Sequence, residues 1–230
     1  MIIKQLSYKF DTQDTDYFFD HLYAEFVPHA LNIIMGDNGV GKSTFFSILC
    51  DNISAHAQLT ATLEVGGTGY EAVNNHMPNA FVQHVHMVQQ QYDAMLADQF
   101  SFKQNLQFAC LPCYPGLHAL PQAQLFDIIN DMNIDIDKPA YLLSGGQRQL
   151  LAILMALQKS TKLLLLDEPT ATLDKKNAVL IMEALAKLAQ KLHVTMLIIS
   201  HDHGLINNYA ARSFVLEKDE QGKRAITLVR

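Results

Sequence analysis

The stretch of the chain that most restricts its fold is GDNGVGKST at residues 36–44. An apolar run at residues 30–35 precedes it and predicts a short buried strand, and residues 42–49 predict the opening of a helix. Glycines at such a turn let backbone N–H groups face inward, and the helix N-terminus adds a positive partial charge. Lys42 and Ser43 supply a cation for phosphate oxygens and a hydroxyl ligand for Mg²⁺. The segment therefore predicts a P-loop that binds a nucleoside triphosphate.

The bulk composition is that of a soluble globular protein. The chain has 230 residues, 49% of them hydrophobic and 17% charged, with a formal charge of −6. This length suits one α/β domain that carries a small inserted subdomain. The acidic balance argues against nucleic acid as a partner, because phosphate backbones attract basic surfaces. No apolar run approaches the roughly 18–20 residues that cross a bilayer, and the N-terminus lacks a secretory stretch. We therefore expect a cytosolic chain that meets a membrane only through a partner protein.

Three cysteines are too few for a disulfide framework. Cys110 and Cys113 have the CxxC spacing of a redox motif or of half a zinc site, and no second CxxC or HxxxH pair lies nearby. We interpret Cys50, Cys110 and Cys113 as incidental thiols, with the redox or metal role as the alternative.

Several short strands open the chain. They are predicted at residues 2–8, 18–26, 30–35, 61–65 and 81–88. The glycine-rich turn at residues 66–69 lacks a following Lys-Ser pair and predicts a hairpin, not a second phosphate loop. His84 and His86 fall on one face of the 81–88 strand. Either they make that face polar or they share a metal ion.

The second half of the chain predicts a helical insertion and then buried strands. Prolines and a glycine punctuate apolar segments between residues 92 and 143, such as 125–132, and predict an inserted helical subdomain. The single domain at 1–230 then has its core at about 1–91 and 144–230. Residues 163–166 and 195–200 read as parallel strands buried on both faces, residues 177–192 as an amphipathic helix, and residues 214–230 as a hairpin.

Two carboxylates follow the apolar run at residues 163–166, in LLLLDEP. Asp167 is placed to hold the Mg²⁺ shell and Glu168 to orient or deprotonate an attacking water. Such a pair often just caps the next helix. Its position downstream of a P-loop favours the catalytic interpretation.

The string LSGGQ at residues 143–147 identifies a family. A serine and two glycines before a long apolar helix at 149–158 make a second helix N-terminus that faces an anion. A serine-capped helix accounts for the serine but not for the whole string. The sequence closely resembles the ATPase subunits of ATP-binding-cassette (ABC) transporters, whose signature motif reads LSGGQ. The resemblance covers nearly the whole chain, with the motifs in family order, including ATLD at 171–174 and SHD at 200–202.

The resemblance implies a fold, two cofactors and a set of site residues. The implied fold is α/β: a P-loop NTPase (RecA-like) core with an N-terminal antiparallel β subdomain and the inserted helical subdomain. ATP and Mg²⁺ are the implied cofactors. The implied catalytic residues are Glu168, His201 and Gln90, and the implied metal-binding residues are Ser43, Gln90 and Asp167. The implied nucleotide-binding residues are Phe10, Gly36, Asp37, Asn38, Gly39, Val40, Gly41, Lys42, Ser43, Thr44, Ser144, Gly145, Gly146, Gln147 and Asp174.

Four of these residues have particular roles in the family. By resemblance, Gln90, chosen by position within the glutamines at 89–91, touches Mg²⁺ and water. Asp174 couples the two sites of a dimer, and His201 contacts the γ-phosphate. Phe10, or alternatively Tyr8, stacks on adenine. ATLD replaces the usual SALD and keeps the aspartate. The segment at 90–105, where such ATPases touch their membrane partner, is longer than usual.

The function implied is that of the ATP-hydrolysing subunit of a membrane transporter, similar to an importer-like group. A separate permease chain and a second copy, or a homologous subunit, would be its partners, at the cytoplasmic face of the inner membrane. The apolar side chains of Met95, Leu96, Phe100 and Phe102 are predicted to be exposed and to receive a permease helix, with packing within the subdomain as the alternative. Two other functions stay open: an ATPase that drives assembly or regulates the cell envelope, and a regulatory module without turnover, against which Glu168 and His201 count.

Overall fold

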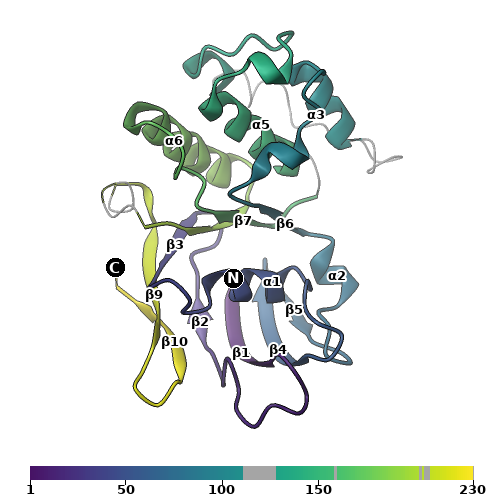
Figure 1. Ribbon diagram of the computed structural model, residues 1–230, viewed down its shortest axis with the longest axis vertical. Coiled ribbons are helices and arrows are strands. Elements are labelled where there is room, and N and C mark those ends of the chain that lie inside the picture. The colour runs from purple at the N-terminus through teal and green to yellow at the C-terminus, as the bar shows by residue number, and fades with distance from the viewer. Residues whose placement is uncertain (111–127, 158–159, 202–203, 205–207, 230) are drawn as a thin grey trace.

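Three tiers make up the computed structural model, which describes residues 1–110, 128–157, 160–201, 204 and 208–229. Helices α3 (Phe102–Cys110), α5 (Gly145–Leu157) and α6 (Lys175–Lys191) form the upper tier (Figure 1). A six-stranded sheet forms the middle tier, and an antiparallel sheet with helix α1 (Lys42–Leu49) forms the lower one. The arrangement agrees with the predicted fold class.

The central sheet has the order β10-β9-β3-β8-β7-β6. Its strands are β3 (Leu31–Met35), β6 (Val85–Val88), β7 (Leu163–Asp167), β8 (Thr195–Ile199), β9 (Arg212–Lys218) and β10 (Arg224–Leu228). All neighbours pair in parallel except β9 and β10, which form the predicted C-terminal hairpin. Side chains of β7 alternate between two apolar clusters, with Leu164 in the cluster above the sheet and Leu165 in the one below. Burial on both faces explains why this strand reads as a continuous apolar run.

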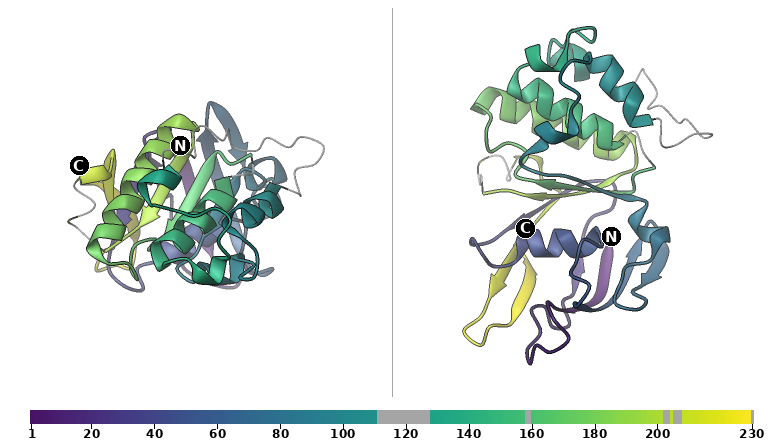
Figure 2. Two further views of the ribbon diagram at one scale, coloured as in Figure 1. Left: turned by 90° about the horizontal axis from the view of Figure 1, so that it is seen from above. Right: turned by 45° about the vertical axis from the view of Figure 1, so that its right-hand side comes forward.

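Helices cover both faces of the central sheet. Helices α5 (Gly145–Leu157) and α6 (Lys175–Lys191) pack on one face. Helix α1 (Lys42–Leu49) lies on the other, between the central sheet and the antiparallel sheet (Figure 2). The antiparallel sheet has the order β2-β1-β4-β5, with β1 (Ile2–Lys9), β2 (Ala24–Glu25), β4 (Gln58–Val65) and β5 (Thr68–Glu71). Its hairpin turns at Gly66 and Gly67, both with positive φ, as predicted.

The described part of the predicted helical insertion includes the 3₁₀ helices η1 (Tyr92–Met95) and η3 (Ala140–Leu142) and the helix α3 (Phe102–Cys110). Arg148 at the start of α5 holds the insertion with ion pairs of 2.6 Å to Asp93 and 2.9 Å to Asp98. The Tyr92 hydroxyl donates a 3.1 Å hydrogen bond to the Gly145 carbonyl. The insertion is thus tied to the N-terminus of α5. Its boundaries at residues 92 and 143 stay a prediction.

Two predicted strands are wrong in part. Within residues 18–26 the only strand is β2, and Phe19 makes an isolated bridge to Tyr8. Within residues 81–88 the strand begins at Val85, because the carbonyl of Pro78 accepts the amides of Phe81 and Val82 and starts helix α2 (Asn79–Val82). A short helix buries Phe81 as completely as a strand would, so alternation alone was misleading.

The histidines of that segment have local polar partners. The His84 Nδ1 lies 2.7 Å from the Ser160 carbonyl oxygen, and the His86 Nδ1 lies 3.0 Å from the Thr161 hydroxyl. No cluster of three metal-ligating side chains occurs in the described part of the chain. These contacts favour the polar interpretation of the two histidines.

Cys50 packs against the lower core, and burial raises the pKa of its thiol to about 11. Such a thiol is a poor nucleophile near neutral pH. The side chain of Cys110 and all of Cys113 lie outside the described residues, as does Asp202 of the SHD motif. Among the helices described, none is long and apolar enough to span a bilayer.

Candidate nucleotide site

The P-loop is the turn between β3 and α1. Gly36 has φ +146°, and a Cβ there would lie 2.2 Å from the Leu216 carbonyl oxygen. Gly41 has φ +117°, and its Cβ would lie 2.7 Å from Cε1 of Phe18. Both positions therefore require glycine. No side chain caps α1, so its first amides are available to an anion at the helix N-terminus.

A cavity of about 200 Å³ opens at the N-terminus of α1. The ends of β3, β7 and β8 meet there because the carboxyl ends of parallel strands lie at one edge of a sheet. The structure brings together nine of the predicted site residues in this cavity, and Ile199 with them. The lining residues are Asn38, Gly39, Gly41, Lys42, Ser43, Thr44, Asp167, Glu168, Ile199 and His201.

Lys42 is only 7% exposed. Its Nζ donates hydrogen bonds of 2.6 Å to the Gly36 carbonyl and 2.9 Å to the Asp37 carbonyl, so the ammonium lies within the loop. Burial lowers the pKa of this ammonium, while the carboxylates of Glu168 and Asp167 favour its charged form. The result is a fixed cation at the wall of the cavity.

The two carboxylates leave β7 in different directions. Asp167 pairs with Ile199 in the sheet. Glu168 has φ +48°, and its N–H donates a 2.9 Å hydrogen bond to the Ile199 carbonyl. A left-handed conformation costs a non-glycine residue roughly 1–2 kcal/mol and is concentrated at functional sites. The turn places the Glu168 carboxylate 3.2 Å from Nε2 of His201.

The residues present fit a magnesium ion. Mg²⁺ prefers oxygen ligands, and the Ser43 hydroxyl and the Asp167 carboxylate line the same cavity. Burial, and next the charge of Glu168, raise the pKa of Asp167 above its ordinary value. A bound dication would offset this electrostatic cost and, in addition, shield the charge of phosphate oxygens.

Replacing Asp167 with Asn should therefore separate stability from function. A raised folded pKa means that the carboxyl stabilises the fold when protonated, and this contribution is lost as pH rises through the folded pKa. At a pH above its folded pKa the ionised Asp167 opposes folding, so Asp167→Asn should melt at a higher temperature there without nucleotide. It should also lose the gain in ATP affinity that Mg²⁺ confers. Thermal melts and ATP titrations with and without Mg²⁺ measure both effects. A lower melting temperature, or an unchanged Mg²⁺ response, would contradict this interpretation.

The signature residues lie away from the cavity in this single chain. The Ser144 amide donates a 3.0 Å hydrogen bond to Oε1 of Gln147, and the Gln147 amide donates a 3.4 Å hydrogen bond to Oγ of Ser144. This reciprocal pair is a capping box at the start of α5. A Cβ on Gly146 would lie 3.3 Å from Cβ of Asn177. Asn177 in turn donates its amide to Asp174, the N-cap of α6. The predicted signature residues and Asp174 thus form one packed unit at two helix N-termini.

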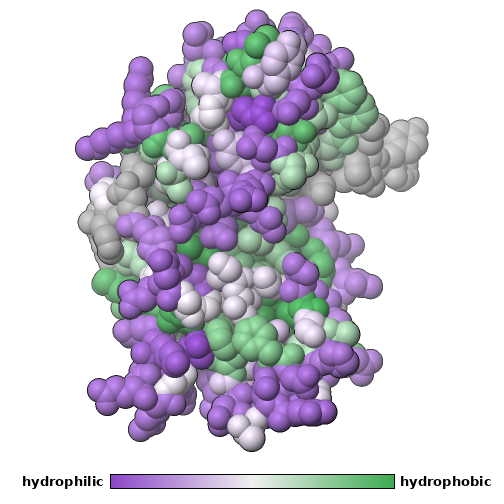
Figure 3. All heavy atoms as spheres, viewed as in Figure 1, coloured by the Kyte–Doolittle hydropathy of each residue, from purple (hydrophilic) through white to green (hydrophobic). Residues whose placement is uncertain are grey.

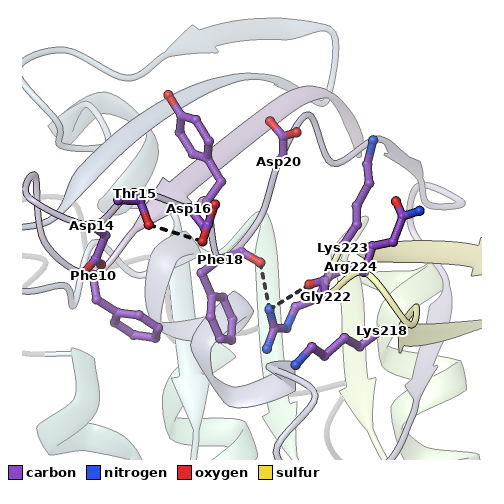
Figure 4. Close-up of a pocket in the computed structure, with 12 residues that line it drawn as sticks. Phe10, Asp14, Thr15, Asp16, Phe18, Asp20, Lys218, Gly222, Lys223 and Arg224 are labelled. Carbon is purple, nitrogen blue, oxygen red and sulfur yellow. Dashed lines mark hydrogen bonds between the residues drawn. The ribbon is translucent and has the colours of Figure 1, made fainter.

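Phe10 lies at a second cavity, of about 520 Å³, between the loop after β1 and the β9–β10 hairpin (Figure 4). Phe10 is 47% exposed, whereas Tyr8 is 2% exposed, so burial favours Phe10 as the aromatic residue open to a ligand. Phe18 packs edge-on to Phe10 at 4.8 Å between ring centroids. Gln90 is exposed after β6 and does not line either cavity.

The remaining predicted P-loop residues contact β9. Gly36, Asp37 and Val40 line a hollow that Leu216 and Lys218 of β9 close. Sequence reasoning missed these β9 residues and Phe18 and Arg224, because nothing in their local pattern signals proximity to a loop far away in the chain.

A strand–P-loop–helix unit with acidic residues at the neighbouring strand end defines a P-loop nucleoside triphosphatase. A family model described as ABC transporter matches residues 19–171. The chain belongs to the ABC transporter family. The family match confirms the predicted family.

Curated relatives include three bacterial ATP-binding proteins. A putative ABC transporter ATP-binding protein of Clostridium acetobutylicum is 28% identical over 80% of this chain and 64% of the relative. The lipoprotein-releasing system ATP-binding protein LolD 1 of Caulobacter vibrioides is 29% identical over 76% of this chain and 74% of its own length. The phosphonates import ATP-binding protein PhnC 1 of a Ruegeria species is 29% identical, with coverages of 79% and 72%. The chain therefore spans just under two thirds of the clostridial relative.

Solved structures share the fold. The post-hydrolysis dimer of the cassette MJ0796 with ADP and Pi has a TM-score of 0.70 at 20% identity, covering 100% of this chain and 98% of that one. The cbiO1 protein of Clostridium perfringens, part of the cbiONQ transporter complex, has a TM-score of 0.71 at 24% identity, with coverages of 97% and 85%. At these identities the likeness shows the fold alone.

Proposed function

We propose that this chain hydrolyses ATP to drive transport through a separate permease, at the cytoplasmic face of the inner membrane. The observation that carries the proposal is the cavity shared by Lys42, Ser43, Asp167, Glu168 and His201. Relatives named as ATP-binding proteins of import and lipoprotein-releasing systems support the link to transport.

Each residue of the cavity has a distinct task in this proposal. Lys42 and the first amides of α1 bind the β- and γ-phosphates. When bound, Mg²⁺ would neutralise charge on the phosphates, and Ser43 and Asp167 would be its protein ligands. Gln90 does not line the cavity in this chain, so it would have to move toward the cavity to become a further ligand. Glu168 accepts the proton of the attacking water, and His201, 3.2 Å from it, orients that carboxylate and contacts the γ-phosphate. Phe10 stacks on the adenine ring from the neighbouring cavity.

A second copy completes the site in this proposal. The signature residues Ser144 to Gln147 and Asp174 lie at helix N-termini that do not line the cavity of their own chain. Such N-termini favour an anion. We therefore propose a two-fold dimer in which the signature of one copy faces the ATP held by the P-loop of the other. The dimeric cassette structures among the neighbours support this arrangement.

The permease contact is proposed for the exposed apolar residues of the helical insertion. Of the four side chains predicted for it, Leu96 and Phe102 are 9% and 0% exposed, so that part of the prediction is wrong: they pack the insertion. Met95 and Phe100 are 36% and 39% exposed. Phe108 of α3, 48% exposed, stacks on Phe100 with 4.9 Å between ring centroids. Figure 3 shows apolar side chains at the level of α3 within a mostly hydrophilic surface.

Replacing Phe100 with Asp should therefore block co-purification of the chain with its permease and leave basal ATP hydrolysis within about twofold of wild type. A charge at the centre of an apolar contact of this kind costs a few kcal/mol, which is roughly a hundredfold in affinity. Leu228→Asp, at a residue 56% exposed on β10, is the matched control and should co-purify normally. An intact complex with Phe100→Asp would place the permease contact elsewhere and count against the proposed coupling.

A further inference from the structure

Arg224 joins the C-terminal hairpin to the P-loop. It lies at the start of β10, opposite Lys218 of β9. Its Nε donates a 2.7 Å hydrogen bond to the carbonyl of Val40, the residue before the last P-loop glycine. Its Nη1 donates to the Phe18 carbonyl at 3.2 Å, and the guanidinium lies 3.7 Å above the centroid of the Phe18 ring. Figure 4 shows the guanidinium at the wall of the larger cavity, beside Phe18.

The contacts of Arg224 use the geometry of arginine. A planar guanidinium can donate to two carbonyls at fixed angles and stack on a ring at the same time, which an ammonium cannot. Among the described residues no carboxylate lies within ion-pair distance of Arg224. Its charge is therefore directed at backbone carbonyls, and hydrogen bonds from charged donors are stronger than neutral ones.

The same hairpin also holds the other end of the P-loop. β9 runs parallel to β3, with Met35 opposite Val215. The backbone of β9 packs so closely on the loop that a Cβ at Gly36 would lie 2.2 Å from the Leu216 carbonyl. The loop is thus held at Gly36 by β9 and at Val40 by Arg224 of β10. In a trans peptide the carbonyl and the N–H point in opposite directions. Because Arg224 of the hairpin holds the Val40 carbonyl, the N–H of Gly41 in the same peptide is directed away from the hairpin.

We infer that Arg224 is a positioning residue for phosphate binding: it fixes the Val40 carbonyl so that the following P-loop amides keep their phosphate-binding orientation. The inference rests on the proposed function of the P-loop. It places the effect of Arg224 on the triphosphate and not on the base, although the guanidinium also faces the cavity that Phe10 lines. The C-terminal hairpin then acts as a support of the nucleotide site.

The test measures binding of two ligands in the presence of Mg²⁺, ATP and inorganic tripolyphosphate, each by competition with a fluorescent nucleotide. Arg224→Ala should weaken both by roughly tenfold, the effect of losing one or two charge-assisted hydrogen bonds. Arg224→Lys keeps one donor for Val40 and should lose a few-fold. Because binding before chemistry is affected, KM for ATP should rise more than kcat falls.

The control is Lys4→Ala. Lys4 is an exposed cation on β1 that pairs with Glu64 at 3.5 Å and lines neither cavity. This variant should bind both ligands within twofold of wild type. Equal losses in Lys4→Ala would assign the effect to general charge and overturn the inference.

Other outcomes overturn it as well. Wild-type affinity in folded Arg224→Ala or Arg224→Lys would show that the contact only supports the fold. A loss for ATP without a loss for tripolyphosphate would move the role to the base cavity. Lys42→Ala in the same assay separates the two proposals: if it binds both ligands like wild type, the proposed nucleotide site itself fails. If Lys42→Ala loses both ligands while the Arg224 variants keep them, only the role of Arg224 is wrong.

Discussion

Lys42→Ala is expected to lose ATP hydrolysis completely and to bind ATP far more weakly than wild type. The ammonium is nearly buried in the loop, with its hydrogen bonds on the carbonyls of Gly36 and Asp37, so a phosphate entering the cavity meets a fixed charge. Loss of such a charge-assisted contact costs on the order of 1.5–3 kcal/mol in binding, which is roughly 10- to 100-fold in affinity. The cost is greater in the transition state, where negative charge develops.

Steady-state phosphate release and equilibrium ATP titration measure the two effects. Lys187→Ala is a suitable control, because Lys187 is a half-exposed cation on α6 that pairs with Asp131 far from the cavity. Hydrolysis at the wild-type rate by Lys42→Ala would remove the basis for the proposed site.

Glu168→Gln is expected to bind ATP with wild-type affinity and to hydrolyse it at least about 100-fold more slowly, the usual contribution of a general base. Glutamine keeps the shape and the left-handed turn but cannot accept a proton from water. The 3.2 Å contact with His201 survives as a hydrogen bond when the histidine donates. Glu71→Gln, on the exposed edge strand β5, serves as the control. Single-turnover hydrolysis by Glu168→Gln at the wild-type rate would show that another group acts as the base.

Local chemistry made the P-loop predictable. The helix after the P-loop begins at Lys42, where the sequence places its opening, because the glycine turn and the apolar run are both local signals. The buried strands β7 and β8 are predictable for the same reason, since strands covered on both faces read as unbroken apolar runs. Asp167 ends β7, and Glu168 and His201 follow β7 and β8, so their meeting with Lys42 follows from parallel pairing.

What the sequence could not predict depends on distant packing. The left-handed φ of Glu168 arises from a hydrogen bond to Ile199 of the neighbouring strand. The burial of Leu96 and Phe102 depends on how the insertion folds onto α5. The hairpin's hold on the P-loop joins Arg224 to Val40 across 184 positions of the chain. No local sequence pattern predicts such contacts. The signature string predicts the start of a helix, but it does not show which copy's phosphate that helix faces.

The most direct test of the two-copy site is sedimentation velocity of Glu168→Gln, alone and combined with Gly145→Asp. A Cβ at Gly145 would meet only Cδ2 of Leu173, at an ordinary van der Waals distance of 3.7 Å, and the aspartate adds a negative charge to the signature. Glu168→Gln should sediment as a dimer with Mg-ATP and as a monomer without nucleotide. The double variant should still bind ATP through Lys42 but remain a monomer, because the added carboxylate repels the partner's γ-phosphate. Dimers of the double variant with ATP, or monomers of Glu168→Gln under the same conditions, would contradict a nucleotide shared between two copies.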